Sequence, residues 1–169
     1  MAFKLPPNPS PERQVTLDDV DRAIITRLCD DGRQSMRALA ERLHISRASV
    51  YARVSRLEDA GIISGYTAVI DPNRLGYGVS AYIYLRIAQH SWKDVRQSIG
   101  MIDEVDHAAL ISGDDDLILL VRTSDAAALR DLVLNRMQTL PGVLSTKTVL
   151  ILDELRQQPS ARSKFGGAP

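Results

Sequence analysis

The chain has 169 residues, of which 44% are hydrophobic and 25% charged, and its 21 basic and 21 acidic residues give a formal net charge of zero. This is the mixture of a globular protein that buries a real core, and the length suits one ordinary domain or two small ones. The single cysteine excludes an internal disulfide, a zinc site lacks ligands, and no apolar run approaches the ~20 residues that span a membrane.

Residues 1–15 are rich in proline and contain no apolar segment. We therefore expect a flexible N-terminal arm rather than a secretory signal. This composition, together with the absence of a spanning segment, predicts a cytoplasmic protein that has no membrane partner.

Residues 16–63 have the apolar periodicity of three short helices. The first helix is expected to begin at Thr16 or Asp18 and to end at Asp31-Gly32, and Ser35 begins the second. The third begins at Ser46 and runs to Ala60, with Gly61 just beyond its end. His44 falls in the turn between the second and third helices, where a left-handed backbone is common and histidine is tolerated. Cys29 lies in the first helical pattern, and we expect its side chain to be buried.

Residues 62–70 are rich in β-formers, with Gly65 in the middle, and predict a short wing followed by a strand. Asp71-Pro72-Asn73 is a breaker cluster that marks a domain boundary. We therefore predict a winged helix-turn-helix domain over residues 16–63 and a linker strand and hinge over 64–78.

The second half alternates short strands with helices. The expected elements are a strand over 79–87, a helix capped by Ser91, strands over 105–111 and 117–121, a helix over 125–140, and a strand over 143–152. This βαββαβ order is that of a ferredoxin-like domain, which we place at residues 79–153, with a disordered tail over 154–169. The predicted class is α+β.

Local charge points to nucleic acid although the total charge is zero. Residues 33–57 hold six arginines and one acid, Glu41, which gives this segment a charge of +5. A basic second helix after a short turn is the helix-turn-helix arrangement, so we expect double-stranded DNA as a partner. The candidate contact residues lie on or beside this helix: Arg37, Ser46, Arg47, Ser49, Tyr51, Arg53 and Arg56.

These candidates differ in their expected roles. Arg47 and Ser49 stand near the start of the helix, where side chains meet base edges, and Arg47 suits a guanine. Arg53 and Arg56 lie further along and are expected to contact phosphates. The alternatives are that individual arginines are merely solvated and that Tyr51 packs against the wing.

The expected sheet has helices on one face only, yet residues 117–121 are apolar on both faces. The opposite face, with Tyr82 and Tyr84, would leave an apolar patch on a monomer, and such patches usually mark interfaces. We therefore predict a homodimer packed sheet to sheet, whose two-fold symmetry suits a roughly palindromic DNA site.

Several segments of the chain form a pattern that is known from one protein family: Leu17-Asp-Asp-Val-Asp-Arg-Ala-Ile, Asp31-Gly32-Arg33, Leu39-Ala40, Ser46, the run from Arg53-Val54-Ser55-Arg56-Leu57-Glu58 to Gly65-Tyr66, and Leu140-Pro141-Gly142-Val143. Through these segments the chain resembles the Lrp/AsnC family of transcriptional regulators over about residues 17–152. The resemblance implies a DNA-binding regulator, not an enzyme, which assembles into dimers and higher oligomers and responds to an amino acid or a related small molecule.

Gly113-Asp114-Asp115-Asp116 is similar to the Gly-x-Tyr-Asp signature of the family. The resemblance implies effector contacts by Ser112, Gly113, Asp114 and Asp116. Asp115 departs from the usual tyrosine, and three adjacent carboxylates repel one another, which alters or abolishes amino-acid binding. A solvated acidic turn and a divalent cation site are the alternatives, although sequential aspartates rarely converge on one ion.

Two other functions compete with the regulator. Siroheme decarboxylases resemble Lrp/AsnC proteins in both halves, and their chemistry uses histidine; here the candidates are His44, His90 and His107. The other alternative is a ligand-binding or assembly module that has lost DNA binding. We expect the regulator, with no cofactor and no metal, because the basic helix is intact and no catalytic motif is present.

Overall fold

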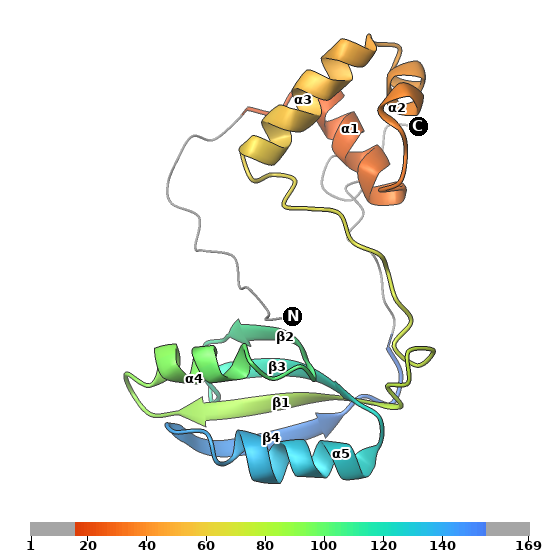
Figure 1. The fold of residues 1–169 in the computed structure, drawn as a ribbon. Coiled ribbons are helices and arrows are strands. Elements are labelled where there is room, and N and C mark those ends of the chain that lie inside the picture. Colours follow the sequence, from red (N-terminus) through yellow and green to blue (C-terminus); the bar gives the residue numbers. More distant parts are fainter. Residues whose placement is uncertain (1–15, 155–169) are drawn as a thin grey trace. The chain divides into compact units, whose positions relative to one another are not determined.

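The computed structural model describes residues 16–154, which fall into two compact units, 16–69 and 70–154 (Figure 1). The first unit holds three helices, α1 (Asp19–Asp30), α2 (Met36–Leu43) and α3 (Arg47–Asp59). The second holds, in chain order, β1 (Val79–Ile87), α4 (Trp92–Ile99), β2 (Val105–Leu110), β3 (Leu117–Thr123), α5 (Ala126–Asp131), the π-helical turn η1 (Leu132–Met137) and β4 (Val143–Leu150). The predicted α+β class and βαββαβ order are confirmed.

Side-chain caps start the three N-terminal helices as their sequence signals predict. Asp18 and Asp21 form a capping box, in which each side chain accepts a backbone N–H of the other residue. Ser35 and Ser46 accept the N–H groups of Ala38 and Ser49, both at 3.1 Å. Because each cap satisfies an N–H that has no partner within its helix, the helices begin at defined residues.

The turns between these helices also have the predicted backbone. His44 ends α2 in the left-handed conformation, with φ 52° and ψ 39°, and Gly61 follows α3 with φ 68°. The three helices enclose a small core of aliphatic side chains: Ile24, Leu28, Leu39, Ala40, Val50, Val54 and Leu57.

Two expectations for this unit are wrong. Cys29 is exposed, because its position on α1 falls outside the stripe that carries Ile24 and Leu28. The wing and strand predicted for residues 62–70 do not form: residues 60–78 contain turns and irregular backbone only. An isolated strand is not stable without a partner, and no strand of the described residues 16–154 pairs with this segment.

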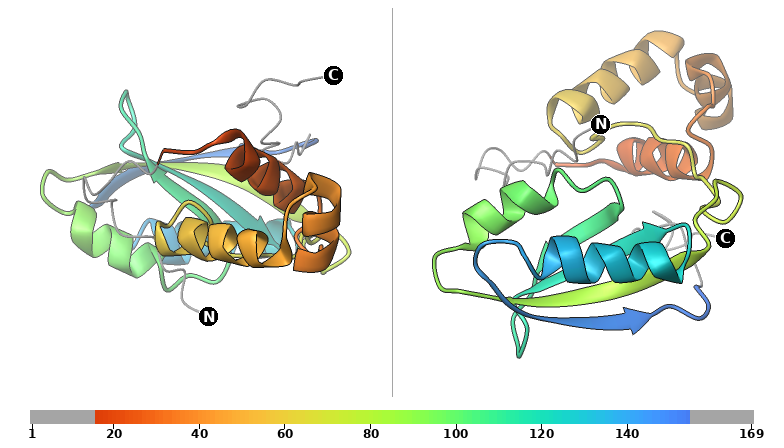
Figure 2. Two further views of the ribbon diagram at one scale, coloured as in Figure 1. Left: turned by 90° about the horizontal axis from the view of Figure 1, so that it is seen from above. Right: turned by 60° about the horizontal axis from the view of Figure 1, so that its bottom comes forward.

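The second unit is a four-stranded antiparallel sheet in the order β2-β3-β1-β4. Ala81 lies opposite both Val121 of β3 and Leu150 of β4, so β1 pairs along both of its edges. Figure 2 shows α4 and α5 on one face of this sheet. Their apolar side chains close the core over the inward-facing residues Ala81, Ile83, Leu85, Leu119 and Val121.

Two local details of this unit differ from the sequence prediction. Ser91 precedes α4 but makes no capping hydrogen bond, since its φ of −85° and ψ of −3° are helical rather than extended. The single helix expected over 125–140 divides into α5 and the π-helical η1. Within residues 16–154, no helix has the length and apolarity that a membrane crossing requires.

Candidate DNA-binding surface and effector pocket

The first candidate site is formed by α2, the turn at His44 and α3, which together make the predicted helix-turn-helix. Val50, Val54 and Leu57 form the buried stripe of α3. The N-terminal half of α3 keeps a different face in solvent, where Arg47 is exposed and the Tyr51 side chain is 59% exposed. Tyr51 is therefore available to a partner, and its packing against a wing is not observed.

Ser46 and Ser49 form the hydrogen-bonded cap at the start of α3. The Ser46 hydroxyl accepts the backbone N–H of Ser49 at 3.1 Å, which leaves its own O–H as a free donor at an exposed position. Ser49 is half-buried beside it. The cap thus fixes the backbone that carries Arg47 and Ser49.

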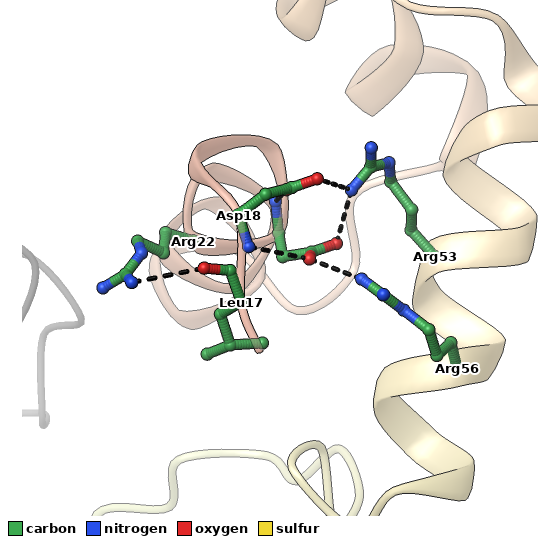
Figure 3. Close-up of polar contacts among 6 residues, drawn as sticks. Leu17, Asp18, Arg22, Arg53 and Arg56 are labelled. Atoms are coloured by element: carbon green, nitrogen blue, oxygen red, sulfur yellow. Dashed lines mark hydrogen bonds and ion pairs between the residues drawn. The ribbon is translucent and has the colours of Figure 1, made fainter. Parts of the chain in front are cut away.

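Arg53 and Arg56, which were expected to contact phosphates, both form ion pairs within the protein. Arg53 Nη1 donates to Asp18 Oδ2 and to Asp21 Oδ1, both at 2.7 Å, and Arg56 Nη2 donates to Asp21 Oδ2 (Figure 3). The Asp21 side chain is 0% exposed, whereas the side chains of Arg53 and Arg56 are 27% and 47% exposed. Both arginines thus join α3 to the start of α1. We call Asp18, Asp21, Arg53 and Arg56 the Asp21 clamp.

The electrostatics of the clamp favour an ionised Asp21. Burial raises the pKa of this carboxyl, but the hydrogen bonds from Arg53, Arg56 and the Asp18 N–H lower it by more. The net result is a pKa lowered from 3.8 to about 2. Since the net effect is a lower pKa, the folded unit holds Asp21 as a carboxylate throughout the neutral range. Its charge offsets that of the neighbouring arginines.

Ion pairs reduce the charge that this surface presents to DNA. Arg37 Nε donates to Glu41 Oε1 at 2.9 Å, one turn along α2, and both side chains are mostly exposed. Half of the six arginines between residues 33 and 57 are therefore paired with acids. Arg33, Arg42 and Arg47 are exposed and form no ion pair with any of the described residues.

The second candidate site is a pocket of about 310 Å³ in the sheet unit. It lies where β1 runs into α4 and where the β2–β3 connection begins and ends, and most of its lining is apolar: Ile87, Ala88, Trp92, Leu110 and Ile111, with Gln89, His90 and Asp116 as polar members. Asp116 Oδ2 accepts the backbone N–H of Ile87 at 2.8 Å. The pocket thus combines a fixed carboxylate with an apolar wall, as small-molecule sites often do.

The predicted effector residues separate around this pocket. Asp116 lines it, whereas Ser112, Gly113 and Asp114 lie in the exposed turn that precedes Asp116. Gly113 has a φ of 145°, which few other residues adopt. Asp115, at the position where the sequence departs from the family signature, forms an ion pair of 2.7 Å with Lys147 of β4.

Sequence reasoning missed His90 and Trp92 as pocket residues. It singles out no functional role for Trp92, and it weighs His90 only as a catalytic candidate. One signal was available in the sequence, since His90 stands between an expected strand and an expected helix. Its φ of 81°, which is unusual outside glycine, is visible only in the structure.

Tyr82 and Tyr84 lie on the face of the sheet that α4 and α5 leave uncovered, because they alternate with the buried Ala81, Ile83 and Leu85. Both tyrosines are half-buried, with Leu120 and Ile118 of β3 opposite them in the register. The ammonium of Lys147 lies 4.5 Å from the centre of the Tyr84 ring. Among the described residues there is no group of three or more histidine, cysteine, aspartate or glutamate side chains with the arrangement of a metal site.

Comparison with protein families assigns both units. Residues 17–64 match the winged helix-turn-helix DNA-binding family, and residues 80–161 match the Lrp/AsnC ligand binding domain. The chain is 35% identical to the HTH-type transcriptional regulator LrpA of Mycobacterium tuberculosis, over 80% of this chain and 90% of that protein. It is 33% identical to the leucine-responsive regulatory protein of Escherichia coli, over 83% and 88%.

Solved structures agree with these matches. The L-Met complex of a transcriptional regulator from Neisseria meningitidis superposes with a TM-score of 0.81 at 29% identity, covering 86% of this chain and 96% of that one. The AsnC protein of E. coli gives a TM-score of 0.79 at 26% identity, covering 85% and 98%. These relatives are regulators, which confirms the regulator prediction and not the decarboxylase alternative. The chain belongs to the Lrp/AsnC family of transcriptional regulators.

Proposed function

We propose that the chain is an amino-acid-responsive DNA-binding regulator in which α3 is the recognition helix. Arg47, Ser49 and Tyr51 contact base edges from its N-terminal half. Ser46 and Arg37 contribute phosphate contacts at the rim, Ser46 through its free O–H and Arg37 through the guanidinium nitrogens that Glu41 leaves free. Residues 16–63 act as the DNA-binding domain, 64–78 as the hinge and 79–153 as the assembly and effector domain.

One observation carries the DNA-binding assignment. The N-terminal half of α3 exposes Arg47 and Tyr51 on a backbone fixed by the Ser46 cap, and no acid lies between residues 42 and 57 to repel phosphate. A helix-turn-helix places these first residues of its second helix in the major groove.

The pocket beside Asp116 is the proposed effector site. The Neisseria meningitidis regulator was solved with L-Met, and a feast or famine regulatory protein of M. tuberculosis was solved with L-methionine. A volume of about 310 Å³ suits a ligand of this size, since it lies at the lower end of small-molecule sites. The Asp116 carboxylate suits an ammonium group, and Ile87, Trp92 and Leu110 suit an apolar side chain.

Self-association is proposed through the helix-free face of the sheet. Tyr82, Tyr84, Ile118, Leu120 and Val149 place apolar surface there, and a second copy would cover it with an identical face. Sedimentation analysis of Tyr82→Asp tests this, with Leu134→Asp, on the exposed surface of η1, as the matched control. A smaller assembly for Tyr82→Asp alone is the expected result, and unchanged sedimentation of both contradicts the proposal.

The decisive experiment measures binding to a duplex that covers the region upstream of the chain's own gene, across a salt series and with a panel of amino acids. We expect sequence-preferring, salt-dependent binding that one amino acid shifts. Arg47→Gln weakens it, whereas Arg130→Gln, which removes the same charge from α5 in the sheet unit, does not. Binding without sequence preference, or equal effects of the two variants, rejects the assignment.

A further inference from the structure

Two of the six arginines in the basic segment direct their charge into the protein. Arg53 and Arg56 share the carboxylate of Asp21: Arg53 donates to one oxygen at 2.7 Å and Arg56 donates to the other. The second oxygen also accepts the Asp18 N–H at 3.1 Å. A buried carboxylate with three donors on two helices is a geometric constraint as well as a charge pair.

We propose that Asp21 of α1, a residue outside the helix-turn-helix pair, is a positioning residue for DNA recognition, which sets the orientation of α3 through Arg53 and Arg56. The inference rests on the proposed role of α3 as the recognition helix. In this view Arg53 and Arg56 hold α3 in place within the domain, and the N-terminal half of the helix makes the DNA contacts.

The physical reason is that the apolar contacts of α3 are not directional. Val50, Val54 and Leu57 decide which face of the helix meets the core, but such contacts tolerate small rotations about the helix axis. Hydrogen bonds have strict geometry, and those of the clamp join residues 32 and 35 positions apart in the chain. Since Arg53 and Arg56 are three residues apart on neighbouring turns, one carboxylate between them opposes both rotation and sliding of α3.

If Asp21 positions α3, the loss of its charge changes DNA affinity in the direction opposite to that expected from charge alone. Asp21→Asn removes a negative charge near the DNA-binding helix, which by charge alone strengthens binding to any duplex. If Asp21 positions α3, the same change weakens specific binding. Asp19→Asn is the matched control, because Asp19 is exposed in the same first turn of α1 and forms no ion pair with the described residues.

The test compares the full-length parent, Asp21→Asn and Asp19→Asn on the upstream duplex and on a scrambled duplex of equal length, at a temperature where each variant is folded by circular dichroism. We expect Asp21→Asn to lose about tenfold in affinity for the upstream duplex and none for the scrambled one, while Asp19→Asn binds as tightly as the parent or more tightly. Equal behaviour of the two variants overturns the inference.

A second measurement remains decisive if Asp21→Asn folds poorly. A cation that contacts a DNA phosphate adds about 0.9 to the magnitude of the slope of log affinity against log salt concentration, whereas a residue that only positions α3 does not. Arg53→Gln is therefore expected to weaken binding with the parent's slope, and Arg47→Gln to lower the slope. A lower slope for Arg53→Gln overturns the inference. Failure of the parent itself to prefer the upstream duplex instead rejects the proposed function.

Discussion

Acid sensitivity of the N-terminal unit follows from the buried carboxylate of Asp21. The folded state lowers its pKa from 3.8 to about 2, so the folded state binds fewer protons than the unfolded state between these values. The contribution of the ionised Asp21 to the free energy of unfolding is therefore present above pH 3.8, and it is lost as the pH falls towards 2. At about 1.4 kcal/mol per pKa unit, this contribution is about 2.5 kcal/mol.

Asp21→Asn removes this contribution, and it replaces the carboxylate that Arg53 and Arg56 share by a neutral amide with a single acceptor oxygen. We expect the variant to lose about 2 to 4 kcal/mol at neutral pH, because breaking a buried ion pair on one side is strongly destabilising. It should also lose less stability than the parent between pH 4 and pH 2, since the group that titrates is absent.

Urea unfolding followed by far-ultraviolet circular dichroism measures these changes, and the single tryptophan supplies an internal control. Trp92 lies on α4 in the other compact unit, so its fluorescence reports on a part of the chain that the substitution does not touch. Asp19→Asn serves as the exposed comparison. The reasoning is refuted if Asp21→Asn unfolds at the parent's urea midpoint, or if parent and variant show the same acid dependence.

Four further substitutions test the packing and capping of the two units. Ile83→Ala, at a fully buried site of β1, should cost about 2–5 kcal/mol in urea unfolding followed by Trp92 fluorescence, and a cost below that range would contradict the core assignment. Gly142→Ala should lower the free energy of unfolding in the same assay by about 1–3 kcal/mol, because the glycine has φ 89° and a new Cβ would lie 2.4 Å from Ser91 Cβ; a neutral result would contradict this. Ser46→Ala should cost about 1 kcal/mol in thermal unfolding of the helices, as should Ser35→Ala, and unchanged melting would mean that the caps are not formed in solution.

The features that the sequence predicted best are local ones. The capping box of Asp18 and Asp21 joins residues three positions apart, and the left-handed turns at His44 and Gly61 each depend on a single backbone position. Strand β1 was equally clear, because its alternating residues separate the core face from the tyrosine face. In each case the physical cause lies within a few residues of the signal.

The clamp was missed because its partners are distant in sequence. Arg53 and Arg56 have the appearance of solvated charges until the folded chain brings Asp21 to them. A signal did exist: Asp21 lies three residues before the buried Ile24 and seven before Leu28, which puts an acid on the apolar stripe of α1. A charge at a core position needs a partner, and the nearby arginines were the available ones.

Other features left no clear trace in the sequence. The π-helical turn η1 interrupts a pattern that an ordinary helix would satisfy equally well. The segment over 60–78 has strand-like composition but no pairing strand among the described residues. The pocket joins His90 and Trp92 to Asp116, and only the sheet register brings these positions together.

The strand order has a consequence for synthesis on the ribosome. The contacts of α1, α2 and α3 are local, so this unit acquires its structure early and quickly. Strand β1 leaves the ribosome next, but its neighbours β3 and β4 follow only at residues 117–123 and 143–150. Until β3 appears, β1 exposes unpaired backbone on both edges and its apolar Ala81, Ile83 and Leu85 to solvent, and until β4 appears one edge stays unpaired. We expect nascent chains that stall before residue 143 to recruit chaperones through β1, and a chain truncated there to aggregate while its helical domain remains folded.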